Sequence, residues 1–312
     1  MKSAVLAACA ALMIPVISGL AQVPAPKAPA PVPKATAAPK PLPVVTPDDA
    51  AKLEALIGSA LSAKPAKARK VLVFSKCEGF VHGDALVYGN KALEIAAAKT
   101  GAFQADFTTD YASINDKANL SKYDAVVLNN TTRLKTKENP AFVPNLIEFV
   151  KSGRGLCVIH SAADNFYDAP EAAEMVGGQF DGHPWGAGGT WAFKVDDPAS
   201  PLNKSFESKS FKAGDEIYQQ KSPFYDRSKL HVLVSLDLSD SVTAKSNVEK
   251  QKRADKDYAV SWIRPFGEGR VFYTSFAHDK RAFMDKARLT HILDGLQYTL
   301  GDLKADDKPV AK

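Results

Sequence analysis

Residues 155–162 read Gly-Leu-Cys-Val-Ile-His-Ser-Ala, a short apolar run that ends directly on a histidine. Such a run is typical of a strand that is covered on both faces, as strands are in a parallel sheet. In an open α/β sheet, ligands bind beyond the carboxyl ends of such strands. The stretch therefore predicts an α/β fold with a parallel sheet, and it also predicts that His160 lies at a ligand-binding or catalytic site.

The same arrangement recurs elsewhere in the chain. Strand-like residues 71–74 lead into the loop that carries His82, and strand-like residues 270–276 are followed by His278. His183 lies in a loop rich in glycine. Imidazoles gathered at one sheet edge can bind a metal or transfer protons near neutral pH. We expect the strand-end imidazoles, including that of the first stretch, to become neighbours in the folded protein.

From residue 70 onward, short apolar runs alternate with helical periodicity. Strands are expected at 71–74, 103–108, 125–129 and 155–159, with helices from near 86 to 101 and over 139–151. Further strand-like runs at 191–195, 231–236, 258–263 and 270–276 precede a last helix over 283–300. Strands joined by helices imply right-handed crossovers. We therefore expect one α/β domain with a mainly parallel sheet, flanked by helices and elaborated by loops in its second half.

The two ends of the chain differ from the middle in composition. Residues 1–21 have the charged start and short apolar core of a signal peptide, which is shorter than a membrane span needs. A linker rich in Pro, Ala and Lys is expected at 22–46, followed by a helix over 47–65, the domain over 66–301 and a flexible tail over 302–312. We expect export to the periplasm or the medium, without a lipid anchor and without a transmembrane segment in the mature chain.

Charge and motifs exclude several partners. The net charge of +5 partly reflects lysines in the linker and tail, and the basic run at 245–256 has no interleaved aromatic residues. We therefore expect no nucleic acid partner. No glycine fingerprint follows the first strand, so NAD, ATP and flavin are not indicated. The sequence does not define the oligomeric state.

Side chains suited to acid–base chemistry lie in a few short segments. His160 stands at the kind of turn where α/β enzymes expose a nucleophile, but Gly-x-Ser-x-Gly is absent and no cysteine occupies the turn. Asp215 and Glu216 can act as a general base, a metal ligand or a group that orients an imidazole, although acidic doublets are often merely solvated. The candidate catalytic residues are His160, His82, His278, Glu216 and Asp215.

The loop over residues 177–186 is suited to binding a sugar, because its glycines let backbone approach a ligand and its tryptophan offers a stacking face. The alternative is that residues 177–186 form an ordinary surface loop that binds no ligand. Candidate substrate-binding residues are His183, Trp185, Tyr218 and Asp181. No pair of histidines has the spacing of a local zinc motif, so a metal held by His82, His160 and His278 would be assembled by the fold.

Seven segments carry a family resemblance. They are Lys70–Ser75, Gly79–His82, Tyr123–Val127, Gly155–Ala162, Val176–Pro184, Asp215–Tyr218 and Gly267–Ser275 with His278. In this order, and over residues 70–301, they resemble the ThuA-like (trehalose utilisation) family.

The resemblance implies a flavodoxin-like sheet of the class I glutamine amidotransferase-like superfamily, without the cysteine nucleophile of that superfamily. It also implies a place in disaccharide catabolism, beside dehydrogenases that make 3-keto sugars. One departure is Tyr258-Ala259, where the family commonly has His-Pro. Any role of that histidine is absent here or passes to Tyr258 or Asp257.

The sequence leaves three hypotheses about the function open. The leading one is an enzyme that cleaves a 3-keto-glycoside by hydrolysis or elimination, using histidine and carboxylate groups or a divalent metal such as zinc. The second is a non-catalytic carbohydrate-binding or scaffolding protein, since a fold does not fix a function. The third is a hydrolase that uses Cys77 with His160. Convergence of the histidines favours the first reading over the second.

Overall fold

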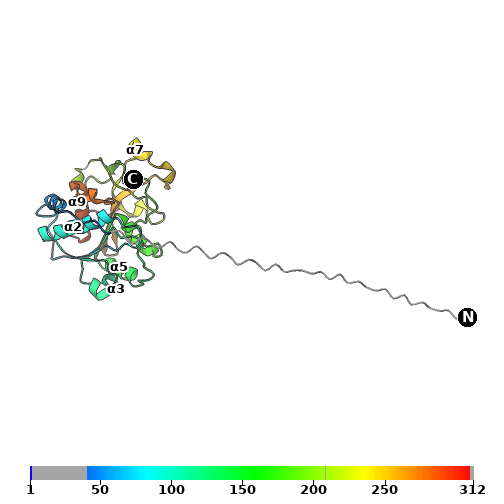
Figure 1. Ribbon diagram of the computed structural model, residues 1–312, viewed down its shortest axis with the longest axis horizontal. Coiled ribbons are helices and arrows are strands. Elements are labelled where there is room, and N and C mark those ends of the chain that lie inside the picture. The colour runs from blue at the N-terminus through cyan, green and yellow to red at the C-terminus, as the bar shows by residue number, and fades with distance from the viewer. Residues whose placement is uncertain (2–40, 208, 310–312) are drawn as a thin grey trace. The chain divides into compact units, whose positions relative to one another are not determined.

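A mixed sheet organises the part of the chain that this computed structural model describes, namely residue 1 and residues 41–207 and 209–309 (Figure 1). Within these residues the sheet has nine strands in the order β2-β1-β3-β4-β9-β8-β7-β5-β6. The parallel strands are β1 (Lys70–Phe74), β2 (Gln104–Thr108), β3 (Ala125–Asn129), β4 (Gly155–Ile159) and β9 (Gly269–Thr274). The antiparallel strands are β5 (Trp191–Val195), β6 (Phe211–Ala213), β7 (His231–Leu236) and β8 (Ala259–Phe266).

The parallel half has the strand order of a flavodoxin-like sheet and confirms the expected fold class. Side chains alternate between two cores along each strand, because successive residues of a strand point to opposite faces. In β1, Val71 and Val73 belong to one core, and Leu72 and Phe74 belong to the other. Both sets are buried, which explains why these strands read as continuous apolar runs.

Helices cover both faces of the sheet. They are α1 (Pro47–Leu56), α2 (Gly83–Thr100), α3 (Ala112–Asn115), α4 (Lys117–Leu120), α5 (Phe142–Lys151), α6 (Pro170–Val176), α7 (Ser241–Ala244), α8 (Lys280–Phe283) and α9 (Lys286–Thr299). The core that includes α1, α2 and α9 lies on one face, and the core that includes α3, α5 and α6 lies on the other (Figure 1).

The second half of the domain combines further strands with long loops, as expected. Four antiparallel strands continue the sheet beyond β9, so the strand-like runs predicted there lie in the same sheet as the parallel strands. The last helix was expected over 283–300 but begins at Lys286, because Asp285 caps α9 by accepting a hydrogen bond from Arg288 N, and Lys280–Phe283 forms the separate short helix α8. Other element ends differ from the expectation by a few residues.

Two expectations about the ends need correction. The helix expected over 47–65 ends at Leu56, because the chain turns there and buries Ile57, and Gly58 follows. The tail expected to be flexible from 302 is anchored as far as it is described. Asp302 pairs with Arg69, and the carbonyl of Lys308 accepts a hydrogen bond from His231.

The predicted signal peptide at 1–21 and most of the predicted linker at 22–46 lie outside the described residues, which resume at residue 41. Among the helices that are described, none combines the length and apolar character needed to cross a bilayer.

Close packing of α9 on β4 generates a prediction for Gly155. A Cβ at this position would lie 2.5 Å from the carbonyl oxygen of Thr299. We expect Gly155→Ala to lower the free energy of unfolding by about 1–3 kcal/mol, since the backbone of α9 must shift. Chemical denaturation measures this. Gly188→Ala is the control, because a Cβ there meets nothing within 4 Å. Equal effects of the two changes would contradict this packing.

A buried carboxyl in α9 generates a pH prediction. Burial raises the pKa of Asp294 from 3.8 to about 7. Between these values the folded state keeps a proton that the unfolded state has lost, so the free energy of unfolding falls as pH rises through this window. Asn is neutral at all pH, and we expect Asp294→Asn to stabilise the protein by about 1–3 kcal/mol at pH 8 and little at pH 4. A stability difference that does not change between these two pH values would contradict the prediction.

Candidate active site

Three histidines converge beyond the carboxyl ends of parallel strands. His82 follows β1 by a loop, His160 follows β4 directly, and His278 follows β9. The ring centroids of His82 and His160 are 5.0 Å apart, those of His82 and His278 are 4.9 Å apart, and those of His160 and His278 are 5.3 Å apart. The expected gathering of these imidazoles is therefore observed, and it follows from the parallel arrangement of their strands.

Glu216 lies among these rings. Its Oε1 is 3.2 Å from His278 Nδ1 and 3.8 Å from His160 Nε2, and its Oε2 is 3.2 Å from His183 Nδ1. Short β-bridges, including one between Trp185 and Ile217, hold the glycine-rich loop against the segment that carries Glu216. This pairing explains how His183, whose side chain is 51% exposed, comes to border the cluster.

His160 is fixed by the end of β9. Its backbone has φ 49°, a left-handed conformation that a non-glycine residue rarely adopts. Its Nδ1 lies 2.6 Å from the carbonyl oxygen of Ser275. Because a carbonyl can only accept, Nδ1 carries the proton and Nε2 is left with its lone pair free. Nε2 is buried without a hydrogen-bond partner among the described residues.

His278 is fixed from behind by Asp215. The carboxylate of Asp215 accepts hydrogen bonds from the backbone N–H groups of Ala277 and His278, and it pairs with Arg288 at 3.2 Å. Ala277 has φ 83°, so these bonds hold a strained turn in place. Asp215 was predicted to be a catalytic residue. It is instead a buried positioning residue, because its oxygens are occupied by the His278 turn and Arg288.

His82 occupies the position that precedes α2, but its side chain does not cap that helix. Its ring packs edge-on against Phe80, with centroids 4.8 Å apart. Its Nδ1 is buried and has no hydrogen-bond partner among the described residues. A histidine whose role was to cap the helix would make such a bond, so His82 does not act as the cap of α2.

The charges of the cluster follow from burial and from Glu216. Burial lowers the pKa of His82 to about 4 and holds that of His160 well below its ordinary value. Burial also disfavours charge on His278, but the Glu216 carboxylate outweighs it and raises the pKa of His278. Burial opposes charge on Glu216 as well, yet His278 and the other imidazoles lower its pKa overall. At neutral pH, therefore, His82 and His160 are neutral beside an ionised carboxylate.

This donor set fits a divalent metal. One ligand atom from each of His82, His160, Glu216 and His278 can be chosen so that all four lie within 4.8 Å of one another. Neutral imidazoles and carboxylates are the ligands that zinc prefers beside thiolates. The unpaired Nδ1 of His82 and Nε2 of His160 are the kind of buried atoms that a metal would satisfy. The hydrogen bond from His160 to Ser275 is the kind that orients a metal-binding imidazole.

The other predicted substrate-binding residues lie in different surroundings. Trp185 is fully buried and donates its Nε1–H to the carbonyl of Thr243, so the expectation that it stacks on a sugar is wrong. Tyr218 is buried with its ring 4.5 Å from that of His160, and it forms part of the wall of the cluster. The carboxylate of Asp181 pairs with Lys252 at 2.6 Å, and its contact with substrate stays a prediction.

Cys77 does not have the surroundings of a nucleophile. Its Sγ donates to the carbonyl oxygen of Asn130 at 3.2 Å. Burial raises the pKa of the Cys77 thiol, whereas a nucleophilic cysteine needs a lowered pKa.

At the position of the family's His-Pro pair, Tyr258 is buried beside Trp185, and Asp257 pairs with Arg227.

Two residues that hold the site were not assigned a role from the sequence. Ser275 accepts from His160 through its carbonyl and from Tyr218 N through its hydroxyl, at 2.9 Å. Arg288, buried in α9, pairs with Asp215. Ser275 lies within a segment that carries the family resemblance, which was the one available signal. Arg288 lies in no segment that carries the family resemblance, and an arginine within a helix does not by itself indicate a function.

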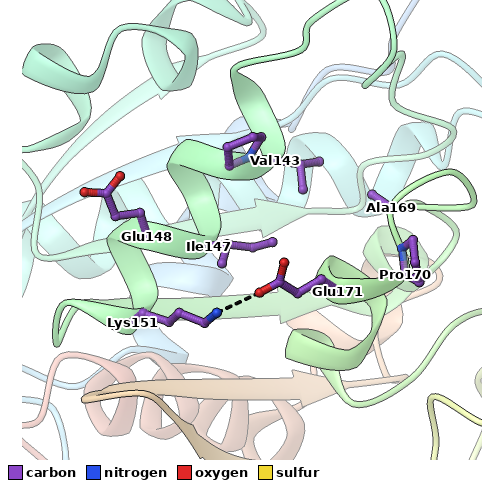
Figure 2. A pocket seen from close by; sticks show the side chains of 8 residues that line it. Val143, Ile147, Glu148, Lys151, Ala169, Pro170 and Glu171 are labelled. Atoms are coloured by element: carbon purple, nitrogen blue, oxygen red, sulfur yellow. Dashed lines mark hydrogen bonds and ion pairs between the residues drawn. The ribbon is translucent and has the colours of Figure 1, made fainter.

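A hollow of about 600 Å³ elsewhere in the molecule lacks comparable chemistry. It lies between α5 and α6, where Lys151 and Glu171 reach toward each other at 2.7 Å (Figure 2). Its lining contains no histidine or cysteine. The histidine cluster is therefore the better candidate for an active site.

The fold and the cluster define an α/β protein with a histidine–carboxylate site at the carboxyl edge of a flavodoxin-like sheet. The chain belongs to the ThuA family, described as trehalose utilisation, whose family model matches residues 70–299. It is thus a member of a carbohydrate-utilisation family. No curated protein matches the chain.

Two solved structures have a similar fold. A ThuA-like protein from Bacteroides uniformis is 21% identical, with a TM-score of 0.63 over 79% of this chain and 98% of that chain. A ThuA-like protein from Parabacteroides merdae is 18% identical, with a TM-score of 0.54 over 77% of this chain and 93% of that chain. At these identities the likeness concerns the fold.

The role of Asp215 as the anchor of the His278 turn can be tested by Asp215→Asn. The amide group presents an N–H where the carboxylate accepts, so we expect a loss of about 1–3 kcal/mol in the free energy of unfolding. Faster hydrogen exchange at the amides of 277 and 278 should accompany it. Asp279→Asn is the matched control, because Asn also caps helices well and Asp279 caps α8. Unchanged exchange at both amides in Asp215→Asn would show that the carboxylate does not hold the turn.

Proposed function

We propose that this protein is an enzyme that cleaves an oxidised disaccharide, a 3-keto-glycoside, at the His82–His160–Glu216–His278 cluster with the help of a divalent metal. The observation that carries the proposal is the group of buried, unpaired imidazole nitrogens facing one carboxylate. Membership of a family described by trehalose utilisation supports a sugar as the substrate.

The chemistry of a 3-keto sugar matches these groups. The ketone at C3 acidifies the hydrogen on C2, so a base can remove that proton and the C1–O bond can then break with formation of a C1–C2 double bond. Glu216, which is ionised, is suited to accept the proton. His183, which lies 3.2 Å from Glu216 and outside the set of metal ligands, is placed to pass a proton to the departing oxygen. Water can then add to C1, which makes the net reaction a hydrolysis.

A metal would be held by His82, His160 and His278, with Glu216 as a further ligand or as the adjacent base. Bound there, the ion would supply a Lewis acid that stabilises negative charge on the oxygen of an enolate. His183 is half exposed and 3.2 Å from Glu216, so it is placed to orient this carboxylate and to meet the substrate from the solvent side.

The two alternative functions, a scaffolding protein and a cysteine hydrolase, are less well supported. A scaffolding protein without a ligand at this site gives no reason to bury ring nitrogens of His82 and His160 without partners, because each such atom costs about 1–3 kcal/mol. A cysteine hydrolase requires a thiolate, and burial disfavours that form of Cys77.

The test is turnover of 3-ketotrehalose by the purified chain, measured with zinc, with chelator, and after restoring zinc to the chelated protein. We expect release of glucose that falls at least tenfold with chelator and returns with zinc. We expect Glu216→Gln to lower kcat/KM by about 10²–10⁴, the usual range for removing an acid–base group. We expect His160→Gln to lower it by at least about tenfold, because a metal ligand is lost.

Two matched variants control for folding. Glu171→Gln changes an exposed glutamate of α6, and His231→Gln changes a histidine bound to Asp197 and Lys308 outside the cluster. Both should keep activity near that of the parent chain. Full turnover by Glu216→Gln or by His160→Gln would refute the proposed site, and turnover that resists chelation would refute the metal.

A further inference from the structure

Arg133 and Tyr167 are exposed side chains near the cluster that are held together by the buried carboxylate of Asp164. Arg133 Nε donates to Asp164 at 3.1 Å, and the Tyr167 hydroxyl donates to the same carboxylate. The guanidinium of Arg133 lies over the ring of Tyr167, 4.3 Å from its centroid. These contacts hold a planar cation in one orientation on an aromatic face.

Two separate contacts place this group next to the histidines. On one side, a Cβ on Gly79 would lie 2.5 Å from Arg133 Cγ, so the arginine stem rests on the backbone that leads to Phe80. The ring of Phe80 packs on His82. On the other side, the backbone next to Asp164 is tied to the wall of the cluster: Phe180 N donates to the carbonyl of Ala163 at 3.0 Å, and the ring of Phe180 lies 4.4 Å from that of Tyr218. Tyr218 in turn packs on His160.

The backbone that carries the group is unusual. Arg133 has φ 50° and Phe166 has φ 61°, both in the left-handed region that non-glycine residues rarely adopt. Residues held in such conformations concentrate at ligand sites, since the surrounding structure must hold them there. Arg133 N donates to the Asp164 carbonyl at 2.9 Å, so the two strained segments brace each other.

The group offers binding surface that the protein itself does not use. Among the described residues, none accepts a hydrogen bond from the terminal nitrogens of Arg133, whose side chain is 52% exposed. The ring of Phe80 is 68% exposed and Tyr167 is 43% exposed. Exposed aromatic faces with fixed donors and acceptors suit a sugar ring, which presents apolar C–H faces and a rim of hydroxyl groups.

We infer that Arg133, Tyr167 and Phe80 bind the second ring of a disaccharide, while the ring to be cleaved lies at the histidines. The terminal nitrogens of Arg133 would bind hydroxyl groups of this second ring, Asp164 would hold the arginine in place, and the aromatic side chains would contact the faces of the ring. The inference rests on the proposed function and deepens it, because it assigns particular residues to the ring of the disaccharide that does not carry the ketone.

The test is calorimetric binding of 3-ketotrehalose and of 3-ketoglucose to the full chain carrying Glu216→Gln, which prevents turnover. We expect the disaccharide to bind at least tenfold more tightly than the monosaccharide. Adding Arg133→Met should remove most of this preference by weakening disaccharide binding about tenfold, and it should leave monosaccharide binding unchanged. Adding Tyr167→Ala should act in the same direction.

Arg264→Met is the matched control, because Arg264 also lies over an aromatic ring, that of Phe266, and belongs to β8. It should leave the preference intact. Equal affinity for the two sugars in the starting chain, or a preference that survives Arg133→Met, would overturn the subsite alone. Failure of the starting chain to bind either sugar would overturn both the subsite and the proposed substrate.

Discussion

The site depends on one constraint: neutral imidazoles are buried with ring nitrogens that the described part of the protein leaves without partners. His82 and His160 are both in this position, and an ionised carboxylate, Glu216, lies beside them. Each unpaired buried nitrogen costs about 1–3 kcal/mol of stability. A cost of this size is understandable where an ion or a substrate satisfies the atoms, because the binding energy then offsets the burial.

The fold meets this constraint with supports from several elements. The parallel strands deliver His160 and His278 to one edge, and left-handed backbone at His160 and Ala277 turns the chain there. Asp215 and Ser275 then hold these turns from behind. Because these supports are buried and fully bonded, the imidazoles are held in place before any ligand arrives, which is the arrangement a binding or catalytic site requires.

The sequence predicted the parallel half of the sheet and the meeting of three histidines, because both follow from local patterns and one rule about strand ends. It could not predict which acidic residue of the 215–216 pair faces the cluster. That choice depends on Arg288 and on the bridge between Trp185 and Ile217, which joins segments far apart in the chain. The prediction that Trp185 stacks on a sugar was wrong for a similar reason, since only the folded protein shows the packing that buries this side chain.

The most direct measurement is anomalous X-ray scattering at the zinc edge from crystals grown with one equivalent of zinc. We predict one strong peak bonded to nitrogen atoms of His82, His160 and His278, with Glu216 bound to it or adjacent. Ordered side chains around a site with no peak, or a peak held by other residues, would contradict it.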